Sequence, residues 1–443
     1  MNRSNEVLSM KMDDFRKYRP PDSGSILIDG AAFGDISMIV GDTTRIRQSP
    51  NLLEVGSSRK SSHAEYKSLH KDDVYSSHRH LSNAAHPMVD RTPFADPETD
   101  LVVTLSKKGS VVELPNQALP RGLRRKTSTQ GEEIKVGSRT GIVKQELGRG
   151  SYGVVVLLDS EREGVIAVKA QSPTDCLAWE YIVMKRLEER CLIDSFPFPR
   201  PLSFVSLADG AMLGMTAGSQ SGMNLVDISN VYKIQEGCQV PELIALHYTA
   251  KMLKHIETLH WHGQILHCDV KPDNWVLVAS SCAYEGCSEV VECADLMLVD
   301  FGRAVDLTSG KDEGVDPMDF KLSGETSDPG MACAAMRMNL GWSFDADTFG
   351  ICASAHVLLY GSHIEMDMDR SKRWKIRKSL RRYWQKDLWT DFFDSLLNDA
   401  IASRPGSLRQ RRETIEAYLK TKAKDLEYLL KHQARILPKK RLD

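Results

Sequence analysis

The residues with the clearest chemical potential lie in the stretch HCDVKPDN, which runs from His267 to Asn274. Asp269 supplies a carboxylate that could accept or orient the proton of an attacking hydroxyl. Lys271 supplies an ammonium that could neutralise charge on a transferring phosphoryl group. Asn274 supplies an amide oxygen of the kind that binds Mg²⁺. The stretch therefore predicts two catalytic residues, Asp269 and Lys271, and one metal ligand, Asn274.

A second acidic motif follows in LMLVDFGRAVDL, where Asp300 ends an apolar run and precedes phenylalanine and glycine. The apolar run predicts a strand, so this carboxylate would lie at a strand end. Such a group is suited to chelating the Mg²⁺ that bridges the phosphates of a nucleotide. We therefore expect Asp300 to be the second metal ligand and Mg²⁺ to be a cofactor.

A glycine-rich stretch, LGRGSYGVV, has a GxGxxGxV spacing. Glycines are expected there because a strand-turn-strand backbone that lies directly on phosphates leaves no room for a Cβ. The next apolar run, VIAVK, ends in Lys169, whose ammonium could reach the α and β phosphates of ATP. The residues expected to bind ATP are Leu147, Gly148, Gly150, Ser151, Tyr152, Gly153, Val155, Ala167 and Lys169.

Lys169 needs a countercharge if it is buried, and Glu180 in CLAWEYIVMKRL is the nearest candidate on the helix that follows. Glu188 and Glu189 are alternatives on the same helix, but they lie two turns or more further on, beside arginines. We therefore assign Glu180 to the catalytic set together with Lys169.

The elements that must position these residues change in character along the chain. Residues 141–171 alternate β-branched runs with glycine turns, which predicts three consecutive antiparallel strands. A helix is expected from Cys176 to Arg190, and the apolar spacing beyond it is increasingly helical. The last helical stretch places one apolar stripe at Ile415, Leu419, Leu426 and Leu430. Strands followed by helices predict an α+β fold of two lobes.

Composition and charge exclude several classes of protein. Hydrophobic residues make up 41% and charged residues 27% of the 443 residues, which is an ordinary globular balance. The formal net charge of −2 gives no general basic field for nucleic acid or a membrane surface. No apolar run approaches the roughly 20 residues of a membrane span. The cysteines form no CxxC pair, which is typical of reduced intracellular thiols.

The chain divides by composition into three parts. Residues 1–137 are polar with short apolar islands, so we expect a largely disordered extension, with an unrecognised small domain as the alternative. A single folded domain is expected over 138–436, followed by a basic tail over 437–443. The basic clusters LRRKTS and PKKRLD could be nuclear import signals, and the first could also be a phosphorylation site; solvated charge runs are the alternative for the first and a frayed helix end for the second.

From about Gly141 to the C-terminus, the motifs quoted above resemble those of eukaryotic protein kinases. The lysine in DVKPDN is similar to the serine/threonine branch. The segments NLVDISNVYK, GRAVDL and GETSDPGMACAAM are similar to the Bub-type mitotic checkpoint kinases. The resemblance implies a bilobal protein-kinase fold, with a small antiparallel β lobe carrying one main helix and a larger helical lobe.

The same resemblance implies ATP-dependent phosphorylation of a protein, with a histone tail among the candidate substrates and checkpoint proteins among the candidate partners. It places the protein in the nucleus and at the kinetochore, or otherwise in the cytoplasm. A pseudokinase scaffold that binds partners without turnover is the alternative. A small-molecule kinase is a third interpretation, which the glycine loop and the lysine of DVKPDN disfavour.

Three departures from the kinase pattern affect how the chain could work. Cys268 stands where many kinases carry an arginine that couples to a phosphorylated activation loop, so another contact must govern activity. Ala335 falls about where a glutamate is usual, so packing of Met331, Met336 and Trp342 is expected to support the lower lobe. No helical-repeat docking domain is recognisable in residues 1–137. By the same resemblance, Asp347 should anchor the backbone of the catalytic loop.

Overall fold

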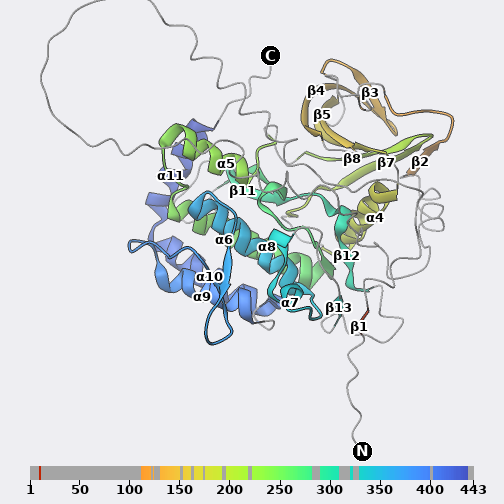
Figure 1. The fold of residues 1–443 in the computed structure, drawn as a ribbon. Helices are drawn as coiled ribbons and strands as arrows, with labels where there is room; N and C mark the ends of the chain where they lie inside the picture. The colour runs from red at the N-terminus through yellow and green to blue at the C-terminus, as the bar shows by residue number, and fades with distance from the viewer. Residues whose placement is uncertain are drawn as a thin grey trace, which may run out of the picture.

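The computed structural model describes residues 9–10, 111–120, 123, 130–149, 153–160, 164–172, 175–191, 196–217, 222–281, 290–308, 320–322, 329–399 and 403–437. Within these residues a curled sheet lies beside a larger helical part, with helix α4 next to the sheet (Figure 1). The bilobal α+β fold expected from the sequence is confirmed. The basic tail from residue 438 onward and most of the N-terminal extension lie outside the described residues.

The small lobe is a seven-stranded sheet in the order β2-β7-β8-β6-β5-β4-β3. Neighbouring strands are antiparallel, except that β2 and β7 are parallel. The strands are β2 (Val111–Leu114), β3 (Glu133–Val136), β4 (Arg139–Arg149), β5 (Gly153–Ser160), β6 (Gly164–Gln171), β7 (Pro201–Leu207) and β8 (Gly210–Thr216). The three consecutive antiparallel strands expected over 141–171 correspond to β4, β5 and β6.

Successive side chains along each strand point to opposite faces of the sheet, and both faces are buried. Ala167 and Lys169 of β6 point to one face, where Ala167 joins the core shared with α4 (Asp175–Arg190) and the large lobe. Ile166 and Val168 point to the other, where the sheet curls over a separate apolar cluster. The curl brings the start of β4 to β7, since Arg139 donates a 3.0 Å hydrogen bond to the carbonyl of Leu202.

The sheet begins before residue 138, contrary to the boundary expected there. β2 and β3 both precede that residue, and Leu119 and Leu123 are buried in the apolar cluster inside the curled sheet. The expectation of disorder is therefore wrong for 111–120, 123 and 130–137. Each of these strands is only four residues long and lies in a polar stretch, so the composition of that stretch concealed them.

The helical part supplies the platform for the catalytic loop. Its helices are α5 (Leu225–Val231), η5 (Tyr232–Glu236), α6 (Glu242–Thr258), η6 (Leu259–Gly263), η7 (Pro272–Asn274), η8 (Phe301–Arg303), η10 (Pro329–Met331), α7 (Ala334–Arg337), α8 (Phe344–Tyr360), α9 (Lys386–Asn398), α10 (Pro405–Thr421) and α11 (Ala423–Ile436). Its short strands are β9 (Ile265–Leu266), β10 (Trp275–Ser281), β11 (Val290–Leu298), β12 (Val305–Asp306), β13 (Lys321–Leu322), β14 (Met366–Met368) and β15 (Trp374–Ile376). β13 also pairs with β1 (Ser9–Met10).

The C-terminal helices bury their apolar stripe as the sequence predicts, and the structure packs them on α6. The expected stripe is buried, with exposed fractions of 3% or less at Ile415, Leu419, Leu426 and Leu430. The stripe is divided between α10 and α11, because the helical backbone is interrupted at Lys422. No helix in the described part of the chain is long and apolar enough to cross a membrane.

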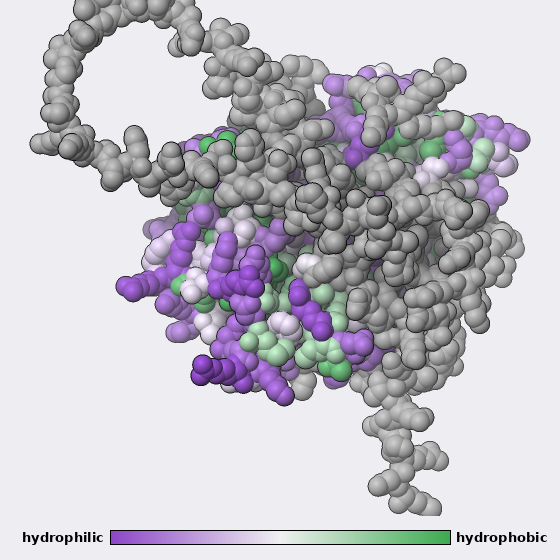
Figure 2. All heavy atoms as spheres, in the orientation of Figure 1, coloured by the Kyte–Doolittle hydropathy of each residue, from purple (hydrophilic) through white to green (hydrophobic). Residues whose placement is uncertain are grey.

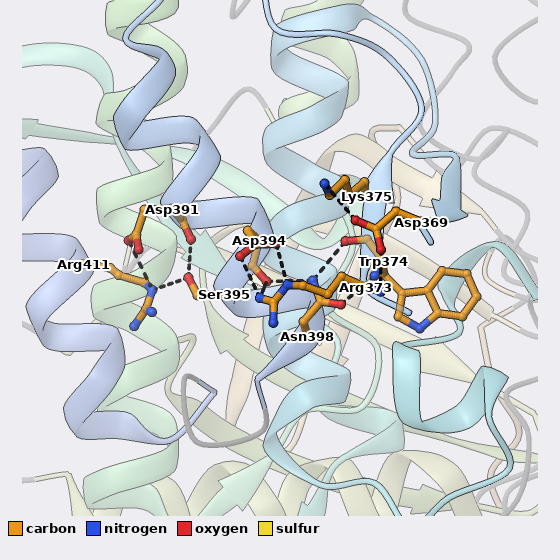
Figure 3. A network of polar contacts seen from close by, with 9 residues as sticks. All are labelled: Asp369, Arg373, Trp374, Lys375, Asp391, Asp394, Ser395, Asn398 and Arg411. Atoms are coloured by element: carbon orange, nitrogen blue, oxygen red, sulfur yellow. Dashed lines mark hydrogen bonds and ion pairs between the residues drawn. The ribbon is translucent and has the colours of Figure 1, made fainter. Parts of the chain in front are cut away.

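A hairpin of β14 and β15 joins α8 to α9 and was not expected from the sequence. Arg373 pairs with the carboxylate of Asp394 on α9 through contacts of 3.0 and 2.6 Å. Asn398 bonds both the main-chain N and O of Trp374, at 2.6 and 2.9 Å (Figure 3). Met366, Trp374 and Ile376 of the hairpin also pack against the core, but the strands are only three residues long, so hydrophobic periodicity gave little sign of it.

One face of the large lobe combines polar and apolar surface. Figure 2 shows hydrophilic side chains over α9 and α10, and more hydrophobic ones gathered near α7. Met338 and Leu340, directly after α7, are 46% and 55% exposed. This apolar surface belongs to the large lobe and lies on the segment between the catalytic loop and α8.

Candidate active site

The small and large lobes meet at Lys169. Its Nζ lies 2.7 Å from Oε2 of Glu180 on α4 and 2.8 Å from Oδ1 of Asp300. The structure therefore brings together three of the residues expected from the sequence. Glu188, one of the two alternatives to Glu180, pairs instead with Lys185 and Arg200.

Burial and charge act in opposite directions on this triad. Burial works to lower the pKa of Lys169, but the carboxylates of Asp300 and Glu180 outweigh it and hold that pKa above its usual value. Burial works to raise the pKa of Asp300, yet Lys169 keeps it well below its ordinary range. Burial raises the pKa of Glu180. Lys169 and Asp300 are therefore both charged near neutral pH.

Asp300 has a left-handed backbone, with φ 70° and ψ 70°. Such a conformation is uncommon for a residue other than glycine and requires support from its surroundings. Phe301 supplies that support: it is fully buried, and its ring packs against those of Phe198 and His267 at centroid distances of 5.7 and 4.9 Å. The backbone is thus fixed where the Asp300 carboxylate faces Lys169.

Asp269 is nearly buried and is surrounded by its expected partners. Lys271 donates to its Oδ2 at 2.9 Å, and Nδ2 of Asn274 donates to its main-chain O at 2.9 Å and its Oδ2 at 3.2 Å. Sequence reasoning missed Arg303, whose guanidinium lies 3.7 Å from Oδ1 of Asp269. Its position directly after the DFG motif was the available signal.

The charges of Asp269 and Asp300 act on a common neighbour. Burial works to lower the pKa of Lys271, but Asp269, Asp273 and Asp300 together raise it above its ordinary value. Lys271 therefore contacts Asp269 and also lies within the electric field of the carboxylate that pairs with Lys169. The two acidic groups and the two lysines form one charged site.

The backbone of the catalytic loop is held from below by Asp347 on α8. Its Oδ2 accepts a 2.8 Å hydrogen bond from the main-chain N of His267, and its Oδ1 accepts one of 2.7 Å from the main-chain N of Cys268. His260, in the π-helical turn η6, bonds Oδ2 at 2.8 Å. The predicted anchoring role of Asp347 is confirmed, and the thiol of Cys268 takes no part in it.

The inner face of the sheet presents the residues expected around the nucleotide. Val155 of β5 lies opposite Lys169 of β6, and Ala167 lies opposite Met215 of β8. The chain at Gly222 packs directly against the side chain of Leu147. A Cβ on residue 222 would lie only 2.6 Å from Cδ2 of Leu147, so a glycine is needed at this position. Leu147 and Ala167 thus belong to the core that faces the large lobe.

The glycine-rich loop is only partly described. Gly150, Ser151 and Tyr152 lie outside the described residues, so their expected contacts with phosphate stay predictions. Gly148, one residue before the end of β4, lies opposite Val155. At Gly153 a Cβ would lie 2.5 Å from the carbonyl oxygen of Ala170 on the neighbouring strand. Close strand pairing is therefore sufficient reason for a glycine at 153, in addition to the reason expected from phosphate binding.

The donor set fits a magnesium nucleotide. Asp300 offers a carboxylate and Asn274 an amide oxygen, and Mg²⁺ prefers hard oxygen ligands. The hydrogen bonds from Asn274 to Asp269 use Nδ2, which leaves the amide oxygen directed to the opposite side of the group. Lys169 and Lys271 supply the positive charge that phosphates require.

The segment before α8 is supported as expected in the absence of a glutamate at Ala335. Met336 and Trp342 are buried, and Met331 packs against the same core. Cys333 adds a polar contact, since its Sγ donates to Oδ2 of Asp345 at 3.0 Å.

This fold and charged site are those of a protein kinase. The family model for the protein kinase domain matches residues 142–409, and the chain belongs to that family. The match covers most of β4, the strands β5 to β8, α4, the catalytic loop, and α6 and α8 beneath it; β2 and β3 precede it.

The relatives it matches are checkpoint kinases, as the resemblance predicted. The chain is 29% identical over 326 residues to the mitotic checkpoint serine/threonine-protein kinase BUB1 of Arabidopsis thaliana, covering 70% of this chain and 58% of that protein. It is 28% identical over 294 residues to the spindle assembly checkpoint serine/threonine-protein kinase BUB1 of Saccharomyces cerevisiae, covering 62% of this chain and 28% of that protein. The chain thus spans less than two thirds of the first relative's length and less than one third of the second's.

The fold also matches a solved structure. The crystal structure of the BubR1 kinase domain superimposes with a TM-score of 0.65 at 22% sequence identity, covering 77% of this chain and 96% of that domain. At this identity the match establishes the fold alone.

Proposed function

We propose that this protein is a magnesium-dependent serine/threonine protein kinase, which transfers the γ-phosphoryl group of ATP to a hydroxyl of a protein substrate. The observation that carries the proposal is the position of Lys169, whose Nζ contacts both Glu180 and Asp300. This arrangement joins the small lobe to Asp300, the carboxylate of the large lobe that would hold Mg²⁺, and so supports phosphoryl transfer.

Each side chain has a defined task in the proposed reaction. Glu180 holds the ammonium of Lys169 in place, so that it can bind the α and β phosphates. Asp269 orients the substrate hydroxyl and accepts its proton, because its carboxylate is fixed by Lys271 and Asn274. Lys271 also neutralises charge on the transferring group. When bound, Mg²⁺ supplies charge neutralisation between the phosphates, and Asp300 and Asn274 would hold it.

Catalysis of this kind depends on positioning and charge rather than on covalent chemistry. Asp347 contributes indirectly, because it fixes the backbone on which Asp269 is carried. The structure can therefore hold the base and the nucleotide-binding lysine in place without a side chain from Cys268.

We further propose that the protein acts as a checkpoint kinase, as the names of its relatives suggest, with a substrate and a cellular location to match. A protein substrate such as a histone tail, partners among checkpoint proteins, and residence in the nucleus or at the kinetochore would follow. Localising a tagged chain in dividing cells, with and without residues 1–137, tests this part separately. Diffuse cytoplasmic signal throughout mitosis in both forms would contradict it.

The second candidate is a pseudokinase scaffold of the same family. What favours a kinase over it is that Lys169, Asp269 and Asp300 are all present and paired. The test is incorporation of label from γ-labelled ATP into a histone tail or casein, with wild-type protein and Asp269→Asn compared. The proposal expects label with wild type alone. Equal incorporation by both proteins, or none by either, would contradict it.

A further inference from the structure

Asp306 of β12 is a buried carboxylate held by two arginines of α4. It is 2% exposed. Arg190 contacts it in a bidentate manner, with NH1 2.9 Å from Oδ1 and NH2 2.8 Å from Oδ2, and Arg186 NH1 lies 2.8 Å from Oδ2. Thr308 completes the group by donating to Oδ1 from its main-chain N and its hydroxyl, at 2.9 and 2.8 Å. We refer to these four residues as the Asp306 cluster.

The Asp306 cluster joins the three elements that carry the active site. Asp306 follows Asp300 closely in the chain, and β12 pairs with β9, where Asp306 lies opposite Ile265 just before the catalytic loop. Arg190 NH1 also donates to the carbonyl of Gly263, at 2.8 Å, in the turn that leads into β9. The C-terminal end of α4 is therefore attached to both large-lobe segments from which Asp269 and Asp300 extend.

Glu180 lies near the N-terminal end of the same helix, α4. A helix is a stiff rod with a rise of about 1.5 Å per residue, so a fixed C-terminal end limits where Glu180 can lie. A further contact prevents rotation of the helix, since Nε1 of Trp179 donates to the carbonyl of Ala304 at 2.9 Å. The position at which Glu180 meets Lys169 is thus set from the large lobe.

The electrostatics favour a permanently charged cluster. Burial works to raise the pKa of Asp306, but the hydrogen bonds and charge of Arg190 and the bonds from Thr308 hold it below its ordinary value. Removal of one partner from a buried, bidentate ion pair strongly lowers stability, because the charge of the other partner is left uncompensated.

We propose that the Asp306 cluster is a positioning device that keeps α4 in the place required for the Lys169–Glu180 pair without any phosphorylation. It takes the role that Cys268 cannot take, since a thiol at that position offers no cation to a phosphorylated loop. Asp306, Arg186 and Arg190 are then positioning residues that act through Glu180. The catalytic part of this inference rests on the proposed kinase function.

The test is a double-mutant cycle on phosphoryl transfer from MgATP to a histone tail. Asp306→Asn and Glu180→Gln are each expected to lower kcat/KM about tenfold or more. The double variant should lose little beyond Glu180→Gln alone, because both changes disable the same pair. Losses that multiply, or wild-type activity in Asp306→Asn, would overturn the inference. Lys185→Gln is the matched control, since it breaks a 2.9 Å pair with Glu188 within α4 and should stay within about twofold of wild type.

Amide hydrogen exchange over residues 177–184 provides a readout that needs no activity. Faster exchange in Asp306→Asn than in wild type and Lys185→Gln is expected, and equal exchange in all three overturns the positioning role. If the wild type transfers no phosphate, the proposed function fails while this readout still tests the cluster. Should Asp306→Asn not fold, Arg190→Lys keeps the charge but loses the bidentate geometry, and an intermediate increase in exchange is expected. Wild-type exchange in that variant would overturn the inference.

Discussion

Oδ1 of Asp347 accepts a hydrogen bond of 2.7 Å from the main-chain N of Cys268. Through this contact and the one to His267, a carboxylate on α8 holds the catalytic loop one residue from Asp269. Cys268 has a left-handed backbone, with φ 58°, that this carboxylate supports. The loop conformation is therefore maintained by main-chain contacts, and the side chain at 268 is free to differ from that of other kinases.

Asp347→Asn should weaken the loop anchor. The asparagine keeps one acceptor but turns an N–H group toward main-chain donors, so buried hydrogen bonds are lost. We expect the free energy of unfolding to fall by about 2–4 kcal/mol and kcat to fall about tenfold or more. Thermal unfolding and steady-state kinetics measure both, and unchanged kcat would show that the loop needs no anchor.

Cys268→Ala should leave catalysis nearly intact. Only the main-chain N of this residue contacts the anchor, and alanine preserves it. Burial also raises the pKa of the thiol well above its ordinary value, so it stays protonated and supplies no charge to the reaction. The kcat is expected to stay within about threefold of wild type. A much larger loss would mean that the thiol itself acts in the site.

Gly350→Ala should disturb the active site from the opposite face of the loop. A Cβ at Gly350 in α8 would lie 2.1 Å from the carbonyl oxygen of Val270, the neighbour of Asp269. We expect a loss of about 1–3 kcal/mol in stability from overpacking, together with a lower kcat. Chemical denaturation and kinetics measure these changes.

Gly406→Ala is the matched control for that substitution. Gly406 lies in the first turn of α10, and nothing lies within 4 Å of an added Cβ. Stability should be unchanged, or higher by up to about 1 kcal/mol, because alanine favours the helix. Equal destabilisation by both substitutions would contradict the close packing of α8 on the loop.

His356 should make the fold sensitive to acid. Burial lowers its pKa from 6.5 to about 4, and its Nε2 is buried without a hydrogen-bond partner while Nδ1 bonds the carbonyl of Ser362. The unfolded chain therefore binds more protons than the folded one between these pH values. Stability should be full above pH 6.5 and should decline, by on the order of 3 kcal/mol, as the pH falls to about 4.

The comparison that isolates this effect is the pH dependence of unfolding in His356→Phe. The variant cannot titrate at this position, so its stability should decline less than that of wild type over the same interval. Parallel pH profiles for the two proteins would contradict the assignment to His356.

Much of the active site could be predicted because its residues lie in short motifs whose spacing determines their roles. Lys169, Glu180 and Asp300 come from separate segments. The local sequence of each segment also predicts the element that carries the residue, a strand end or a helix face. The C-terminal helices were predictable for a similar reason, since a helical stripe such as Ile415 and Leu419 is a periodic signal.

The parts that sequence reasoning missed have no such periodicity. β2 and β3 are four residues long, too short for alternation to stand out from a polar segment. Asp306 gains its role from Arg190, a residue far away in the sequence, and only the folded chain brings the two together. The hairpin of β14 and β15 depends on polar contacts such as Arg373 with Asp394.

The most direct test of the account is single-turnover transfer by Asp269→Asn, with its affinity for MgATP measured separately by calorimetry. Lys169 and Asp300 are untouched in this variant, so binding of MgATP should match wild type within about twofold. The rate of transfer should fall about a thousandfold or more, because the asparagine cannot accept the proton of the substrate hydroxyl. Transfer within a few-fold of the wild-type rate, with MgATP bound equally well, would contradict the assignment of Asp269 as the catalytic base.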